Sequence, residues 1–82
     1  MKKIILEIEG MACSMCEAHV NEAIRRAVPS AKKVSSSHKR GECSFVTEEA
    51  VSEETIRRAM DQIGYGFRGM RVEEYVKKGL FG

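Results

Sequence analysis

Two cysteines separated by two residues are the feature of this sequence best suited to chemistry. Cys13 and Cys16 lie in the run Met11-Ala12-Cys13-Ser14-Met15-Cys16, just ahead of a segment with helical periodicity. Two thiols in a loop that turns into a helix can converge on one ion, and the free N–H groups and dipole at the helix start favour thiolate over thiol. Both sulfurs are soft donors, which suits Cu(I) best and also Zn(II), Hg(II) or Co(II). We therefore expect Cys13 and Cys16 to be the metal ligands.

The number of sulfur donors indicates what such a site does. A closed structural zinc site needs four ligands, typically two such pairs, and this chain has one pair. Two thiolates are enough for a two-coordinate monovalent ion and leave it open to an incoming sulfur, which predicts a carrier that exchanges its metal. A metal sensor, or a carrier of Zn(II), Hg(II) or Co(II), is the alternative.

An enzyme that uses the same pair is a further alternative. A dithiol–disulfide oxidoreductase would cycle Cys13 and Cys16 between thiols and a disulfide. That class usually couples the motif to a thioredoxin-like βαβ pattern. Here Ser14 and Met15 separate the cysteines without a proline, and the chain has no Trp. We do not expect this protein to be an enzyme.

Four other side chains carry possible donor atoms. Met15 lies between the two cysteines and is better explained as an exposed loop residue. His19 lies one helical turn after Cys16 and is better explained as part of a polar helix face, although it is the best candidate donor if Zn(II) or Co(II) is preferred. His38 is expected in a hairpin, exposed to solvent. Cys43 alternates with an aromatic residue along a strand, which predicts a buried small hydrophobe and no third ligand.

The elements that position the pair follow from periodicity and breaker residues. We expect a strand, a helix, two strands, a second helix and a last strand, at Lys3–Glu9, from Ser14–Cys16 to Pro29, within Ala31–Lys39, at Glu42–Thr47, from Ser52 to Gly64, and at Tyr65–Met70. Two amphipathic helices can cover one face of a four-stranded antiparallel sheet. The order therefore predicts an α+β sandwich of the ferredoxin-like βαββαβ type.

The run Gly10-Met11-Ala12-Cys13-Ser14-Met15-Cys16 resembles the GMxCxxC motif of the heavy-metal-associated domain, which occurs in copper chaperones and at the N-termini of copper-transporting P-type ATPases. The similarity extends from about Lys3 to Gly69. It implies the βαββαβ fold, Cu(I) on Cys13 and Cys16, and a core position for Met11 beneath the loop. The tyrosine matching Tyr65 lies beside the metal loop in many bacterial members, so Tyr65 is either core packing or a lid.

Two segments depart from the family pattern. The stretch Ser35-Ser36-Ser37-His38 is unusually polar for a second strand, which predicts a short or loose strand. We divide the chain into a heavy-metal-associated domain at 1–70 and a C-terminal extension at 71–82. Val72, Tyr75 and Val76 have helical spacing in that extension, which fits a short helix or a frayed tail equally well.

Length and composition limit the remaining classes. The chain has 82 residues, 43% hydrophobic and 32% charged, with a net charge of +2 and no Trp, so neither a large substrate pocket nor a nucleic-acid partner is expected. No apolar run approaches the ~20 residues of a membrane span, so we expect a cytoplasmic protein with no direct membrane insertion. Its partner would be a copper-transporting P-type ATPase or another CxxC domain. We expect a monomer without metal, with a metal-bridged dimer as the alternative metal-bound state.

Overall fold

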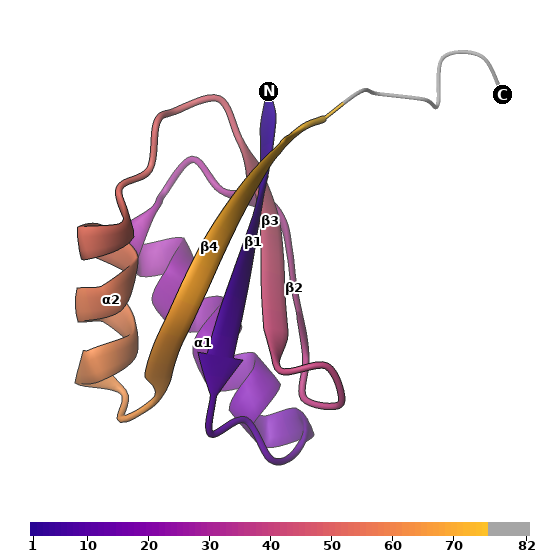
Figure 1. The fold of residues 1–82 in the computed structure, drawn as a ribbon, viewed down its shortest axis with the longest axis vertical. Coiled ribbons are helices and arrows are strands. Elements are labelled where there is room, and N and C mark those ends of the chain that lie inside the picture. Colours follow the sequence, from indigo (N-terminus) through magenta and orange to yellow (C-terminus); the bar gives the residue numbers. More distant parts are fainter. Residues whose placement is uncertain (76–82) are drawn as a thin grey trace, which may run out of the picture.

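The structure, a computed structural model, describes residues 1–75 of the chain. Its elements follow the expected order, as β1 (Lys2–Glu9), α1 (Ser14–Ala27), β2 (Lys32–Ser37), β3 (Glu42–Thr47), α2 (Glu53–Gln62) and β4 (Gly66–Glu74). The four strands form one antiparallel sheet in the order β2-β3-β1-β4. Both helices lie against the same face of that sheet (Figure 1). The predicted ferredoxin-like βαββαβ fold is confirmed.

Strand alternation places the core between the sheet and the helices. Ile4, Leu6 and Ile8 of β1 share the helix-facing side, and each is at most 4% exposed. Phe45 pairs with Ile4 across β1 and β3 and points to the same side. Each helix contributes an apolar stripe to this core, made by Val20 and Ile24 of α1 and by Ile56, Ala59 and Met60 of α2.

The two ends of α2 are fixed by local hydrogen bonds. Ser52 caps the start, because its hydroxyl accepts a hydrogen bond from the backbone N–H of Thr55 at 3.2 Å. At the other end Gly64 has a φ of 81°, and the N–H of Tyr65 donates to the carbonyl of Met60 at 3.0 Å. This Schellman arrangement reverses the chain directly after the helix. Ile63 lies just past the helix and is 36% exposed.

The last strand is longer than the sequence predicted. We expected it at Tyr65–Met70, whereas β4 continues to Glu74. The extra residues pair with the beginning of β1, with Val72 opposite Ile4 and Glu74 opposite Lys2. This pairing gives the backbone hydrogen bonds that a helix would otherwise supply. A helix starting at residue 71 is therefore wrong for residues 71–74, and residues 76–82 lie outside the described part of the chain.

The second strand is short and irregular, as its polar sequence predicted. β2 is an edge strand of six residues, and its register on β3 shifts between Lys32 and Ser35. Lys33 within this shift has a φ of 54°, a left-handed conformation that costs a non-glycine residue free energy. Gly41, with a φ of 67°, closes the turn to β3.

Candidate metal centre

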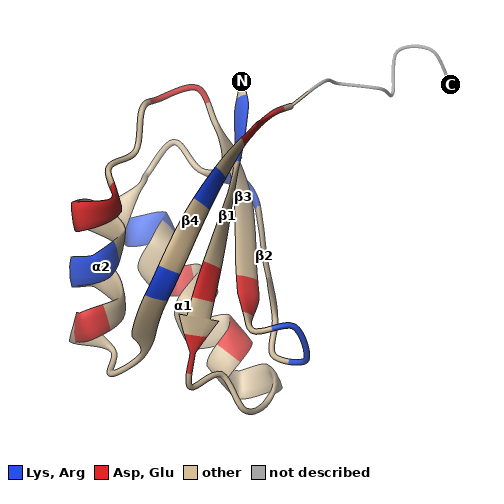
Figure 2. Cartoon of the chain, in the orientation of Figure 1, with Lys and Arg blue, Asp and Glu red and all other residues tan. Residues whose placement is uncertain are grey.

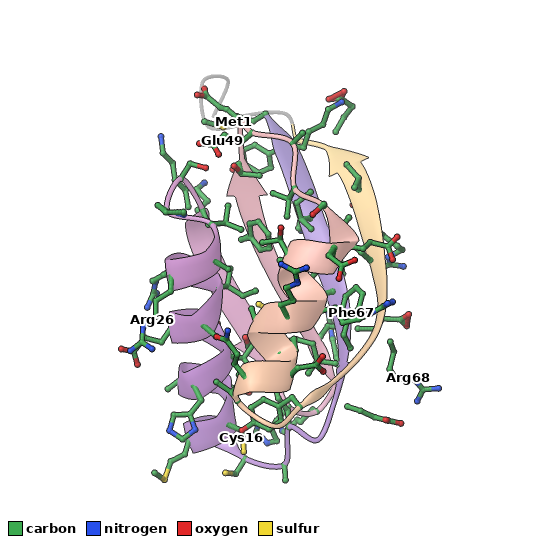
Figure 3. All side chains as sticks on the ribbon, turned by 90° about the vertical axis from the view of Figure 1, so that its left-hand side faces the viewer. Met1, Cys16, Arg26, Glu49, Phe67 and Arg68 are labelled. Atoms are coloured by element: carbon green, nitrogen blue, oxygen red, sulfur yellow. The ribbon has the colours of Figure 1, made fainter. Side chains whose placement is uncertain are left out.

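The cysteine loop projects from one end of the sheet, between the end of β1 and the start of α1. Gly10 turns the chain with a φ of 104°, and Met11 then inserts into the core, where it is 7% exposed. Cys13 is the N-cap residue of α1 in extended conformation, and Cys16 lies in the first turn. Figure 3 shows Cys16 at the lower end of α1, far along the helix from Arg26. Met11 therefore anchors the loop to the core, while the thiols of Cys13 and Cys16 face outward.

The two sulfurs are close enough to bind one ion. Sγ of Cys13 and Sγ of Cys16 are 3.6 Å apart, with Cys13 exposed and Cys16 half-buried. A linear two-coordinate ion with metal–sulfur bonds of about 2.3 Å would hold its sulfurs about 4.6 Å apart. The pair must therefore open by about 1 Å for a linear ion. Cys13 has the freedom to move, because its side chain makes no capping hydrogen bond to the helix.

Hydrogen bonds at the loop favour the thiolate form of Cys16. The hydroxyl of Tyr65 contributes most, followed by the backbone N–H of Ala12 and the thiol of Cys13, and together they lower the pKa of Cys16 from 9.0 to about 7. The same contact with Cys16 raises the pKa of the Tyr65 hydroxyl. Cys16 is therefore ready to bind a soft cation near neutral pH.

Tyr65, which the sequence predicted to be either core packing or a lid, lies against the cysteine loop. Its ring packs so closely against the loop that a Cβ atom at Gly10 would lie only 3.0 Å from Cδ1 of Tyr65. Its hydroxyl reaches Cys16. Gly10 is required twice, for its left-handed backbone and for this close approach of the ring.

The other candidate donors are not drawn into the site. Met15 is 69% exposed and His19 is exposed on α1. Cys43 is 1% exposed inside the core, and burial raises the pKa of its thiol, as expected for a small hydrophobe. Over residues 1–75 no group of three or more His, Cys, Asp or Glu side chains could hold a metal ion. The cysteine pair therefore has no third protein donor of these types within that part of the chain.

The sequence predicted that His38 is exposed to solvent in the hairpin, but the structure shows it partly buried. Its ring Nδ1 and its backbone N lie 2.7 Å from the same carboxylate oxygen of Glu17, and its side chain is 32% exposed. Glu17 directly follows Cys16, and sequence reasoning did not single it out. The signal that could have revealed this contact is the polar stretch before His38, because polar side chains that face a helix require polar partners on that helix.

Comparison with known proteins identifies the family. The family model described as "Heavy-metal-associated domain" matches residues 5–66. A mercuric reductase of Lysinibacillus sphaericus is 35% identical over 65 residues, which are 79% of this chain and 12% of that protein. The chain thus spans about one-eighth of the length of this curated relative.

Solved structures share the fold. The CopZ metallochaperone superimposes with a TM-score of 0.70 at 22% identity, covering 80% of this chain and 98% of that one. A copper binding domain from HMA7, a P-type ATPase, superimposes with a TM-score of 0.70 at 24% identity, and the match covers 92% of this chain and 100% of that one.

The family model covers most of the chain. The chain belongs to the heavy-metal-associated domain family. In residues 1–75 no helix has the length and apolarity needed to cross a lipid bilayer.

Proposed function

We propose that this protein is a carrier that binds Cu(I) through the thiolates of Cys13 and Cys16 and transfers it to the CxxC site of another domain. The observation that carries the proposal is the sulfur pair itself, 3.6 Å apart on an outward-facing loop, with the pKa of Cys16 lowered to about 7. Two soft thiolates with no third His, Cys, Asp or Glu donor in residues 1–75 suit a two-coordinate ion.

The open coordination of such an ion explains how transfer can be fast. A thiolate of the receiving domain adds to the bound ion before either protein sulfur leaves. Cys13 then departs first, because it is exposed and lies outside the helix, and Cys16 departs after it. Each metal–sulfur bond that breaks is replaced by one that forms, so the ion never has to enter water alone. When Cys16 is released, its thiolate is stabilised by the Tyr65 hydroxyl.

Hg(II) is the second candidate ion, and a specific observation favours it. The relatives with the higher sequence identity are mercuric reductases, at 35% over 65 residues and 37% over 62 residues. The same two thiolates would bind Hg(II), since it is also soft and accepts two sulfur ligands. Zn(II) and Co(II) rank lower, because a closed zinc site uses four ligands.

The partner follows from the same chemistry. We expect a second CxxC domain, such as the metal-binding domain of a copper-transporting P-type ATPase, in a reducing compartment such as the cytoplasm that keeps the thiols free. Acidic and basic residues both occur on α2 and on β4 (Figure 2), so these elements present mixed charge to a partner.

Competitive titration tests the proposal. The reduced protein is titrated anaerobically with Cu(I), Hg(II) and Zn(II) against a chelator of known affinity. Replacing Cys13 or Cys16 with Ser should abolish tight binding, and Cys43→Ser is the matched control that should retain it. Metal binding that survives in both single variants would refute the two-thiolate site.

A transfer experiment separates a carrier from a store. The metal-loaded protein is mixed either with an excess of a CxxC domain or with a small chelator of equal affinity. A carrier delivers metal to the domain much faster than to the chelator. Equal slow rates would instead indicate a buffer or a sensor.

A further inference from the structure

A row of polar contacts joins α1 to the β2 side of the sheet. Asn21 Oδ1 accepts a hydrogen bond from the Ser36 hydroxyl at 2.6 Å, and Glu17 accepts from His38 one helical turn nearer the cysteines. Glu17 and Asn21 are four residues apart on the helix, while Ser36 and His38 are two apart on the chain, so the two periodicities match across the contact. We call these four residues the α1–β2 seam.

The seam explains why the second strand is so polar. Ser36 in β2 and His38, just after the strand, face polar side chains of α1, and both contacts are part-buried. Their partners lie 15 and 21 residues earlier in the chain, on a helix rather than on a neighbouring strand. The seam therefore replaces, along this edge, the apolar packing that the family pattern led us to expect.

The contact nearer the metal loop is the stronger of the two. Both the backbone N–H and the ring Nδ1 of His38 lie 2.7 Å from Oε2 of Glu17. A carboxylate only accepts, so both His38 groups donate to this one oxygen, and hydrogen bonds to a charged acceptor are stronger than neutral ones. The Glu17 side chain is 25% exposed, and these bonds lower its pKa. In Figure 1 the β2–β3 turn lies at the same end of the molecule as the start of α1.

The two metal-site cysteines differ sharply in their support. Cys16 lies in the first turn of α1, directly before Glu17, and so belongs to the segment that this contact holds. Cys13 lies outside the helix, is exposed and makes no capping bond.

We infer that Glu17 and His38 are positioning residues, which fix the first turn of α1 to the β2–β3 turn so that Cys16 stays in place while Cys13 moves. This inference rests on the proposed metal site and adds a structural cause for the order in which its ligands exchange. Cys16 is the retained ligand and Cys13 the exchanging one because of a contact that touches neither sulfur.

Amide hydrogen exchange on the metal-free protein tests the anchoring without any metal. The amides of Ala18, His19 and Val20 bond carbonyls of the first turn, by the i to i−4 pattern of the helix. In Glu17→Ala these amides should exchange at least about tenfold faster, because a hydrogen bond to a charged group is lost. Asn21→Ala is the matched control, since it removes the neighbouring seam contact one turn away and should change these three amides by less than about twofold.

A conservative variant separates position from charge. In Glu17→Gln the side-chain oxygen can still accept hydrogen bonds from both donors of His38. The amides of Ala18, His19 and Val20 should therefore exchange within about threefold of their wild-type rates. In the metal-loaded protein, release of the ion to a small chelator should accelerate in Glu17→Ala by about tenfold and stay near the wild-type rate in Glu17→Gln and Asn21→Ala. Absence of metal binding in the wild type would end the proposed function but leave the exchange result intact.

Three outcomes would overturn the inference. Equal acceleration in Glu17→Ala and Asn21→Ala would mean that the seam only stabilises the whole fold. A Glu17→Gln variant that behaves like Glu17→Ala would mean that charge, not position, is at work. Unchanged amides in Glu17→Ala would mean that the first turn is held by other contacts.

Discussion

Removing one oxygen atom, in Tyr65→Phe, should shift the reactivity of the metal site at neutral pH. The Tyr65 hydroxyl is the largest of the contributions that bring the pKa of Cys16 from 9.0 to about 7, while the ring that packs on Gly10 is retained. Losing the largest of several contributions should raise the pKa of Cys16 by about one unit. At pH 7 the thiolate fraction would then fall from about one half to about one tenth, and alkylation would slow about fivefold.

The assay is the rate of Cys16 modification by iodoacetamide in the metal-free protein between pH 5.5 and 10, read by mass spectrometry that resolves Cys16 from Cys13. Wild type and Tyr65→Phe should differ near pH 7 and converge near pH 10, where both are thiolates. Tyr75→Phe is the matched control, because its hydroxyl contacts Lys33 rather than the loop. Identical pH profiles for the wild type and Tyr65→Phe would refute the assignment of the hydroxyl to Cys16.

Three further predictions concern stability. Cys43→Ser should lower the free energy of unfolding by ~1–3 kcal/mol, since it buries a hydroxyl, and leave Cu(I) affinity unchanged in titration. Met11→Ala should cost ~2–5 kcal/mol in chemical denaturation by leaving a cavity, and X-ray absorption should show two sulfur ligands in both proteins; a third sulfur that disappears in the variant would contradict its packing role. The lowered pKa of Glu17 adds stability that is full above its unfolded value of 4.5 and is lost as pH falls through the folded pKa. Melting temperatures of wild type and Glu17→Gln should therefore differ at pH 6, and the difference should shrink as the pH falls below 4.5; a constant difference would exclude this linkage.

The helices and the central strands could be predicted from the sequence because their signals are local. The apolar spacing of Ile56, Ala59 and Met60, the cap at Ser52 and the stop at Gly64 lie within a few residues of one another. β4 could not be delimited in this way. Val72 has a spacing compatible with a helix, and only the first residues of β1, about 70 positions earlier, show that a strand partner exists.

The same difference between local signals and partners distant in sequence applies to the candidate site. The spacing of Cys13 and Cys16 and the burial of Cys43 follow from neighbours in sequence. The acidity of Cys16 does not, because its main cause is Tyr65, which a helix end delivers from 49 positions away. The role of Glu17 was missed for the same reason, since its partner His38 lies 21 residues later, in the turn between β2 and β3.

The pairing of β4 with the start of β1 also decides how this domain could be tethered. The N–H of Tyr75 donates to the carbonyl of Met1 at 3.3 Å, so the chain enters and leaves the described fold at one end (Figure 1). The cysteine loop follows the far end of β1, whose eight residues span about 25 Å. A linker attached on either side would leave the thiols unobstructed. Such a tether could hold the loop near an acceptor at an effective concentration on the order of millimolar, which turns a bimolecular encounter into an intramolecular one.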